Sequence, residues 1–211
     1  AFAAQALAVN KELGLDAAGA IVGLLHDMGK ATNAFQAYLA DSCAHPEQRG
    51  CNSVPHAPIG AIFAYERWFG GDQLTRLTAQ IISMSIYGHH AGLPDCLDER
   101  GESPYLSSFS PEGKMRLHYR EAVENYLREV ATPDELDALF ARALSEIKAL
   151  GARLESGEQA HQLGLIARTV LSAVVDADRW DSACFERDAD PLAPAAPAPD
   201  WLELLNRLVT Y

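Results

Sequence analysis

An all-α fold is predicted by three features of this chain. Apolar residues recur at spacings of three and four, whereas the alternation typical of strands is scarce. The 211 residues are 48% apolar, which is ample for one domain with a substantial core. The periodic segments predict helices over 17–25, 58–69, 74–87, 114–130, 134–154 and 162–175.

Local signals support several of these helix ends. Gly70 and Gly71 separate the second segment from the third, and Gly151 lies near the end of the fifth. The run Thr132, Pro133, Asp134, Glu135 predicts a helix start, because proline suits the first helical position and acidic residues in the first turn interact favourably with the helix dipole.

Two stretches read as irregular. Residues 91–113 are rich in Gly, Pro, Ser and Asp, and predict a long loop that either borders a site or is a mobile surface connection. Residues 188–200 form a Pro/Ala segment expected to be extended and semi-rigid. We therefore expect one domain over 1–187, a strap or linker over 188–200, and a terminal helix over 201–211.

The segment 23–36, GLLHDMGKATNAFQ, places His26 beside Asp27 at a predicted helix end. An imidazole beside a carboxylate is typical of a divalent-metal site, although a helix-capping pair would look the same. Consecutive helical residues point about 100° apart, so the pair can serve one ion only near a helix end. We expect Gly29 to let the backbone turn there.

Further possible ligands occur at or in other apolar, helix-length segments. They are His56, His89, His90 and Asp178. A solvated histidine would tend to fall in a polar loop, whereas ligands on several helices can converge in the interior of a bundle.

The order His-Asp, His, His-His, Asp resembles the HD metal-dependent phosphohydrolase superfamily. The segments 23–36, 88–95 (GHHAGLPD) and 175–181 (VDADRWD) more closely resemble the HD nuclease domain of the CRISPR-associated nuclease-helicase. The resemblance implies an HD-domain helical bundle around a dinuclear metal site. It also implies a histidine on a helix before the His-Asp pair, but residues 1–25 contain none, so that ligand lies upstream or is absent.

The family pattern implies a ligand set for each of two ions. Asp27 bridges, since a carboxylate has two oxygens and an imidazole cannot bridge. The other ligands are His26 and Asp178 on the first ion, and His56, His89 and His90 on the second. Asp178 is preferred to Asp176, because the sequence around it matches the family's terminal aspartate better. Four imidazoles favour Mn, Fe, Co or Ni as the two divalent transition-metal ions, with Mg possible.

The activity that the resemblance implies is metal-dependent hydrolysis of phosphodiester bonds in single-stranded DNA during CRISPR interference. The catalytic residues would be Asp27 and Lys30, which lies three residues further on and would hold a phosphate oxygen unless it is an ordinary solvent lysine. The implied partners are a helicase domain, fused or separate, and a CRISPR target-recognition complex.

Charge argues against unaided DNA binding. The chain has 17 Lys and Arg against 29 Asp and Glu, a formal net charge of −12, and would repel a phosphate backbone at long range. Attraction must then come from another domain or from a basic patch, such as Arg67, Arg76, Lys114, Arg116 and Arg120. An HD phosphohydrolase acting on nucleotides or other small phosphoesters, and a non-catalytic HD scaffold, both stay open as alternatives.

The sequence also argues against a membrane protein, a zinc knuckle and a disulfide scaffold. No apolar run reaches the roughly 20 residues needed to span a bilayer, and no signal peptide is visible, so we expect a soluble cytoplasmic protein without membrane contact. The spacing of the cysteines fits neither a zinc knuckle nor a disulfide scaffold, and we expect reduced thiols at Cys43, Cys51, Cys96 and Cys184.

Overall fold

The structure is a computed structural model that describes residues 13–45, 56–110, 118–153, 159–187, 190 and 206–207, without the side chains of 57 and 159–161. The chain divides into two compact units, Ala1–Asp178 and Arg179–Tyr211. Every residue of the expected metal site lies in the first unit.

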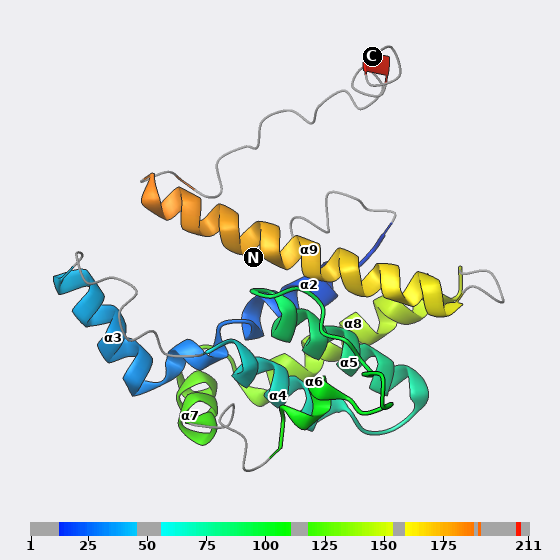
Figure 1. Cartoon of the computed structure of the whole chain (residues 1–211), viewed down its shortest axis with the longest axis horizontal. Coiled ribbons are helices and arrows are strands. Elements are labelled where there is room, and N and C mark those ends of the chain that lie inside the picture. The colour runs from blue at the N-terminus through cyan, green and yellow to red at the C-terminus, as the bar shows by residue number, and fades with distance from the viewer. Residues whose placement is uncertain are drawn as a thin grey trace. The chain divides into compact units, whose positions relative to one another are not determined.

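The predicted all-α class is confirmed, since the described residues form helices and no strand (Figure 1). In chain order the elements are α2 (Asp16–Leu25), the 3-10 turn η1 (Met28–Ala31), α3 (Asn33–Ala44), α4 (Ala57–Trp68), α5 (Gln73–Gly88), α6 (Pro104–Ser107), α7 (Tyr119–Glu129), α8 (Pro133–Gly151) and α9 (Gln159–Glu186).

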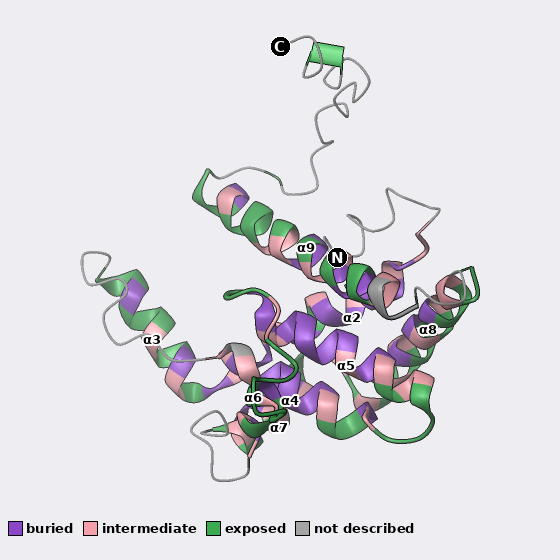
Figure 2. Ribbon diagram, turned by 45° about the vertical axis from the view of Figure 1, so that its right-hand side comes forward, coloured by how far each residue is buried: buried purple, intermediate pink, exposed green. Residues whose placement is uncertain are grey.

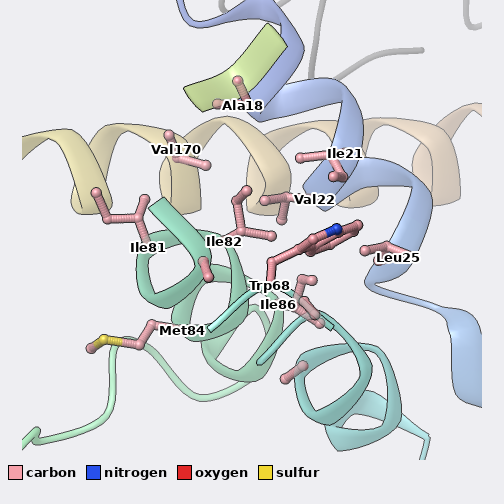
Figure 3. Close-up of a cluster of buried hydrophobic side chains, with 14 of the residues drawn as sticks. Ala18, Ile21, Val22, Leu25, Trp68, Ile81, Ile82, Met84, Ile86 and Val170 are labelled. Carbon is pink, nitrogen blue, oxygen red and sulfur yellow. The ribbon is translucent and has the colours of Figure 1, made fainter. Parts of the chain in front are cut away.

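The core lies where α2, α4, α5 and α8 pack together. α4 runs along α5, and α2 contacts both α8 and α5. Figure 2 shows that burial is concentrated on these central helices, and Figure 3 shows apolar side chains of α2 and α5 converging with Trp68 of α4 and Val170 of α9. The shared core fixes the C-terminal ends of α2 and α5, and both ends carry expected metal ligands.

Four of the sequence predictions are confirmed closely. The helices expected over 17–25, 58–69 and 74–87 appear with ends within one residue of those positions. The helix expected over 134–154 begins at Pro133 but ends early, at Gly151. Its N-cap is Thr132, whose hydroxyl accepts a hydrogen bond from the Glu135 amide while the Glu135 carboxylate accepts one from the Thr132 amide.

Other helix bounds are wrong. The expected helix over 114–130 begins only at Tyr119, because His118 adopts a left-handed backbone with φ of 64°; residues 114–117 lie outside the described residues. The helix expected over 162–175 extends from Gln159 to Glu186, since the exposed polar residues after Val175 weaken the apolar periodicity without breaking the helix.

Helix α3 was not expected. Its buried residues are Phe35 and Ser42, seven positions apart, so it lacks the apolar periodicity on which the other assignments depend. Figures 1 and 2 both show it extending away from the central helices beyond η1.

The stretch expected to be a loop over 91–113 is anchored as far as it is described. It contains the short helix α6, and the side chains of Tyr105 and Phe109 are buried in the core. The Tyr105 hydroxyl donates a hydrogen bond to Ser83 of α5. The described part of this segment is therefore not a mobile connection, because its aromatic side chains fix it to the core.

The expectations for the cysteines and for the C-terminal segments concern residues that the structure describes only in part. Cys43, Cys96 and Cys184 are free thiols, and Cys51 lies outside the described residues. The segments 188–200 and 201–211 also lie outside them, apart from Asp190 and the helical pair Asn206 and Arg207. Within the described part of the chain, no helix combines the length and apolarity needed to cross a membrane.

Candidate metal centre

Two histidines are presented in the same way at the ends of two core helices. His26 follows α2 and His89 follows α5, each as the C-terminal cap. The Nδ1 of His26 bonds to the Gly23 carbonyl at 2.9 Å, and the Nδ1 of His89 bonds to the Ile86 carbonyl at 2.6 Å. A backbone carbonyl that accepts from one ring nitrogen orients the ring and leaves the other nitrogen available, as is usual for metal-binding histidines.

Acidic side chains meet the free nitrogen of His26. Its Nε2 lies 3.2 Å from the Asp27 Oδ2 and 3.7 Å from the Asp178 Oδ1 of α9. The Lys30 Nζ lies 2.6 Å from the same Asp27 oxygen, so in this structure the lysine is an ion-pair partner of the aspartate rather than a free solvent lysine. Asp178, and not Asp176, reaches the centre.

The other Asp27 oxygen faces a second group of side chains. His56, which caps the start of α4, has its Nε2 3.6 Å from the Asp27 Oδ1 and 3.2 Å from the His90 Nε2. The His89 and His90 rings lie side by side, with centroids 3.9 Å apart.

The structure therefore brings all six expected ligands together, in two clusters. The first consists of His26, Asp27 and Asp178, and the second of His56, His89 and His90. Within each cluster the donor atoms lie within 4.8 Å of one another, so each cluster could hold a metal ion. Asp27 directs one oxygen toward each cluster. Whether the residues bind metal as expected stays a prediction.

Two buried atoms provide a test of whether a metal would fit. Among the residues that the structure describes, the Asp27 Oδ1 and the His89 Nε2 have no hydrogen-bond partner. A buried polar atom without a partner is costly, and these two belong to different clusters. Divalent ions would satisfy both atoms, so the residues fit a metal centre.

The two clusters also differ electrostatically. Burial lowers the pKa of His26, but hydrogen bonds to Asp178 and Asp27 outweigh it and raise that pKa to about 9. Burial raises the pKa of Asp27, yet the neighbouring His26 and Lys30 hold it well below its usual range. In the second cluster burial lowers the pKa of His89 to about 4. His26 is therefore a cation beside carboxylates at neutral pH, whereas His89 is neutral.

Glycines permit the close approach of α4 to the His-Asp segment. A Cβ built on Gly29 would lie 2.2 Å from the His56 carbonyl oxygen, and one on Gly60 would lie 2.0 Å from the Leu25 carbonyl oxygen. Gly29 is not among the positive-φ glycines, so the expectation that it lets the backbone turn is wrong. It is needed because only a residue without a side chain lets the His56 backbone lie against it.

Helix α7 holds the His-Asp segment from the other side, through what we call the α7 clamp: Glu121, Asn125 and Tyr126. The Tyr126 hydroxyl donates to the Leu24 carbonyl, and the Asn125 amide donates to the Ala31 carbonyl, both at 2.8 Å. The Glu121 carboxylate accepts from the Asn33 amide at 2.9 Å. These bonds attach the backbone on both sides of Asp27 to α7.

Sequence reasoning found the possible ligands but missed these supports. Asn125, Tyr126 and Gly60 lie in helices whose local pattern gives no sign of the centre. A glycine within the apolar helix segment IGAIFA was the one available signal, because glycine there costs helix stability and implies a close contact.

In the structure, one residue of the expected basic patch is paired with an acidic side chain instead of being available to DNA. The Arg67 guanidinium donates two hydrogen bonds to the Asp137 carboxylate, at 2.6 and 2.7 Å, so this arginine already has an acidic partner. Arg76 and Arg120 are exposed, and the remaining expected members, Lys114 and Arg116, lie outside the described residues.

Comparison with known proteins places this chain in a family. The model of the family described as "Cas3, HD domain" matches residues 2–173. The protein "CRISPR-associated nuclease/helicase Cas3" of Haloferax volcanii is 34% identical over 114 residues, which are 53% of this chain and 11% of that relative. The matched part is thus a small share of the relative's length. No solved structure matches the chain.

Proposed function

Because this chain belongs to the Cas3 HD-domain family, we propose that it is a metal-dependent nuclease that hydrolyses phosphodiester bonds of single-stranded DNA. The observation that carries the proposal is the pair of ligand clusters with Asp27 between them. A carboxylate placed to serve two ions is the arrangement expected of a two-metal phosphodiesterase.

We assign His26, Asp27 and Asp178 to one ion and His56, His89 and His90 to the other, with Asp27 shared. When bound, such a pair of ions supplies Lewis acidity and a nucleophilic water. Four imidazoles among six ligands favour Mn, Fe, Co or Ni, while the two carboxylates keep Mg within reach of the first cluster.

Lys30 is proposed as the catalytic cation. Its ammonium lies 2.6 Å from Asp27 and its side chain is 38% exposed, so it can remain at the site and still reach a substrate from solvent. We propose that it holds a non-bridging phosphate oxygen and stabilises the charge that develops there. Gln36 helps to position Lys30, since the Gln36 side-chain amide donates a hydrogen bond to the Lys30 backbone carbonyl at 2.8 Å.

The proposed partners follow from the relative's printed name and from charge. A chain with a net charge of −12 has little long-range attraction for DNA, so a helicase, fused or separate, would have to deliver the strand. We propose that this delivery occurs during CRISPR interference, in the cytoplasm, after a target-recognition complex has displaced one DNA strand.

A second candidate function is favoured by the same acidic charge. A phosphohydrolase acting on nucleotides or other small phosphoesters needs no extended contact with a DNA backbone, so the net charge of −12 would not hinder it.

The test is hydrolysis by metal-stripped protein to which Mn, Co, Ni or Mg is returned. We expect slow, metal-dependent degradation of a circular single-stranded DNA, weakening as salt rises, with duplex DNA left largely intact. Faster turnover of mononucleotides than of DNA would favour the second function. Efficient digestion of duplex DNA without metal would contradict the proposal.

A further inference from the structure

The part of the 23–36 motif that the metal chemistry does not use lies at the start of α3. Phe35 is 8% exposed, and its ring centroid is 5.1 Å from that of His56, in an edge-to-face arrangement. The Phe35 ring also meets the Tyr38 ring, with centroids 5.8 Å apart and again edge to face. A row of rings thus leads from the second cluster outward along α3.

The outer ring of this row is accessible. Tyr38 is half-buried, and within the described part of the chain its hydroxyl has no hydrogen-bond partner. The next residue, Leu39, is 46% exposed. α3 itself extends away from the central helices in both views (Figures 1 and 2). Tyr38 therefore offers an aromatic surface two ring contacts from the metal centre.

Charge decides what such a surface could bind. With a net charge of −12 the protein has little attraction for an extended phosphate backbone, and the contact proposed for Lys30 concerns only the phosphate at the metal centre. A base that stacks on an aromatic ring is held without any contact to phosphate, and every base has a face that can stack. Binding through bases rather than phosphates suits an acidic protein.

We propose that Tyr38, supported by Phe35, is a stacking platform for an unpaired base of the DNA strand whose phosphate lies in the metal centre. This inference rests on the proposed nuclease function. It also accounts for the preference for single strands that we propose, because bases in a duplex already stack on their neighbours and cannot stack on Tyr38 without unpairing.

The test compares Tyr38→Ala with Tyr38→Phe and Tyr38→Leu in the whole chain. Binding is measured without cleavage, in chelator, from the fluorescence of 2-aminopurine in a short single strand and from its anisotropy. Cleavage of the same strand is then measured with Mn²⁺. We expect Y38A and Y38L to weaken binding and raise KM about tenfold, with a smaller effect on kcat, whereas Y38F should behave as the wild type.

Controls separate stacking from damage to the site or the helix. Mn²⁺ affinity measured by calorimetry should stay within about twofold in every variant, since Tyr38 is not a ligand. Leu39→Ala, which removes exposed apolar surface beside Tyr38 without removing a ring, should change KM much less than Y38A. A strand with abasic residues should bind the wild type and Y38A equally.

The outcomes distinguish this inference from the proposed function. If the wild type cleaves single-stranded DNA and Y38L matches Y38F in KM and in 2-aminopurine fluorescence, the stacking platform is wrong while the nuclease assignment stands. If the wild type cleaves no DNA with any of the metals, the nuclease assignment is wrong, and the stacking platform with it.

Discussion

The two clusters of the metal centre differ in chemistry. The first contains two carboxylates and one imidazole, which pair with one another and with Lys30. The second contains three imidazoles, of which His56 and His90 face each other at 3.2 Å and His89 keeps a buried nitrogen without a partner among the described residues. Ion pairs satisfy most of the first cluster without a metal and leave one buried atom, the Asp27 Oδ1, without a hydrogen-bond partner among the described residues. The second cluster contains no carboxylate that could pair with its imidazoles.

The clusters also differ in how the chain supports them. Hydrogen bonds from the α7 clamp hold the backbone around Asp27. His56 is instead placed by steric contact, where its backbone lies against Gly29. We therefore expect the first cluster to tolerate the loss of one supporting hydrogen bond, because water can replace that bond. We expect the second cluster to be sensitive to an atom added at Gly29, because the His56 backbone would then have to move.

The largest effect is expected for Asp27→Ala, which removes the residue that the two clusters share. Metals supply several kcal/mol of transition-state stabilisation, so losing both should reduce DNA cleavage by about a thousandfold or more. Single-turnover cleavage with Mn²⁺ measures it. The control is Asp176→Ala, an exposed aspartate of α9 outside both clusters, which should cleave normally. Substantial activity in the Asp27 variant would place the bridge elsewhere.

The next effect is expected for Gly29→Ala. A Cβ 2.2 Å from the His56 carbonyl must displace the start of α4, which should destabilise the fold by about 1–3 kcal/mol and lower the bound metal from two ions to one. Denaturant unfolding and elemental analysis measure these changes.

The matched control for that substitution is Gly164→Ala, on α9, where an added Cβ meets nothing within 4 Å. Because alanine is the better helix former by about 1 kcal/mol, this variant should be slightly more stable and keep both ions. Equal behaviour of the two variants would show that the Gly29 contact does not position His56.

Metal preference should also separate the clusters. Removing an imidazole by His89→Ala should weaken Ni²⁺ binding at the second site by at least about tenfold and leave Mg²⁺ binding unchanged, since Mg²⁺ prefers the carboxylates of the first cluster. Asp178→Ala should have the reverse effect. Calorimetric titration of each variant with each ion checks this, and an identical loss of both ions in both variants would argue against two distinct sites.

A smaller effect is expected from Asn125→Ala in the α7 clamp. It removes the hydrogen bond to the Ala31 carbonyl, worth about 1 kcal/mol, together with an exposed one that the Asn125 side chain accepts from Arg128. Loss of the Ala31 bond should weaken metal binding at the first cluster up to about tenfold while sparing the second. Glu124→Ala, an exposed neighbour on the same helix, serves as the control. Equal losses at both clusters would mean that the clamp supports the fold in general.

The last expected difference between the clusters is the number of protons that metal binding releases. With its pKa raised to about 9, His26 carries a proton at pH 7.5 that an ion must displace, so binding at the first cluster should release about one proton. Affinity there should rise by up to about tenfold per pH unit until pH 9. His89, with its pKa lowered to about 4, has no proton to release. Calorimetry in two buffers of different ionisation enthalpy measures this, and buffer-independent heats would contradict it.

Local pattern in the sequence was enough to predict the helical class, the bounds of α2, α4 and α5, and the choice of possible ligands. Apolar spacing reports directly which face of a helix is buried, and a histidine or aspartate at the end of such a segment stands out against it. The same method missed α3 because only Phe35 and Ser42 of that helix are buried. It also ended α9 before Asp178, because periodicity fades where a helix leaves the core.

The arrangement of those ligands depended on packing between distant segments. The His56 backbone lies against Gly29, and the Phe35 ring meets the His56 ring. Asn125 and Tyr126 hold the backbone beside Asp27. All of these contacts join segments that are separate in the sequence. Spacing along one helix describes only that helix's own faces. Which faces meet is set by the crossing of helices in the core, where a single absent Cβ, as at Gly29 or Gly60, decides how closely two backbones approach.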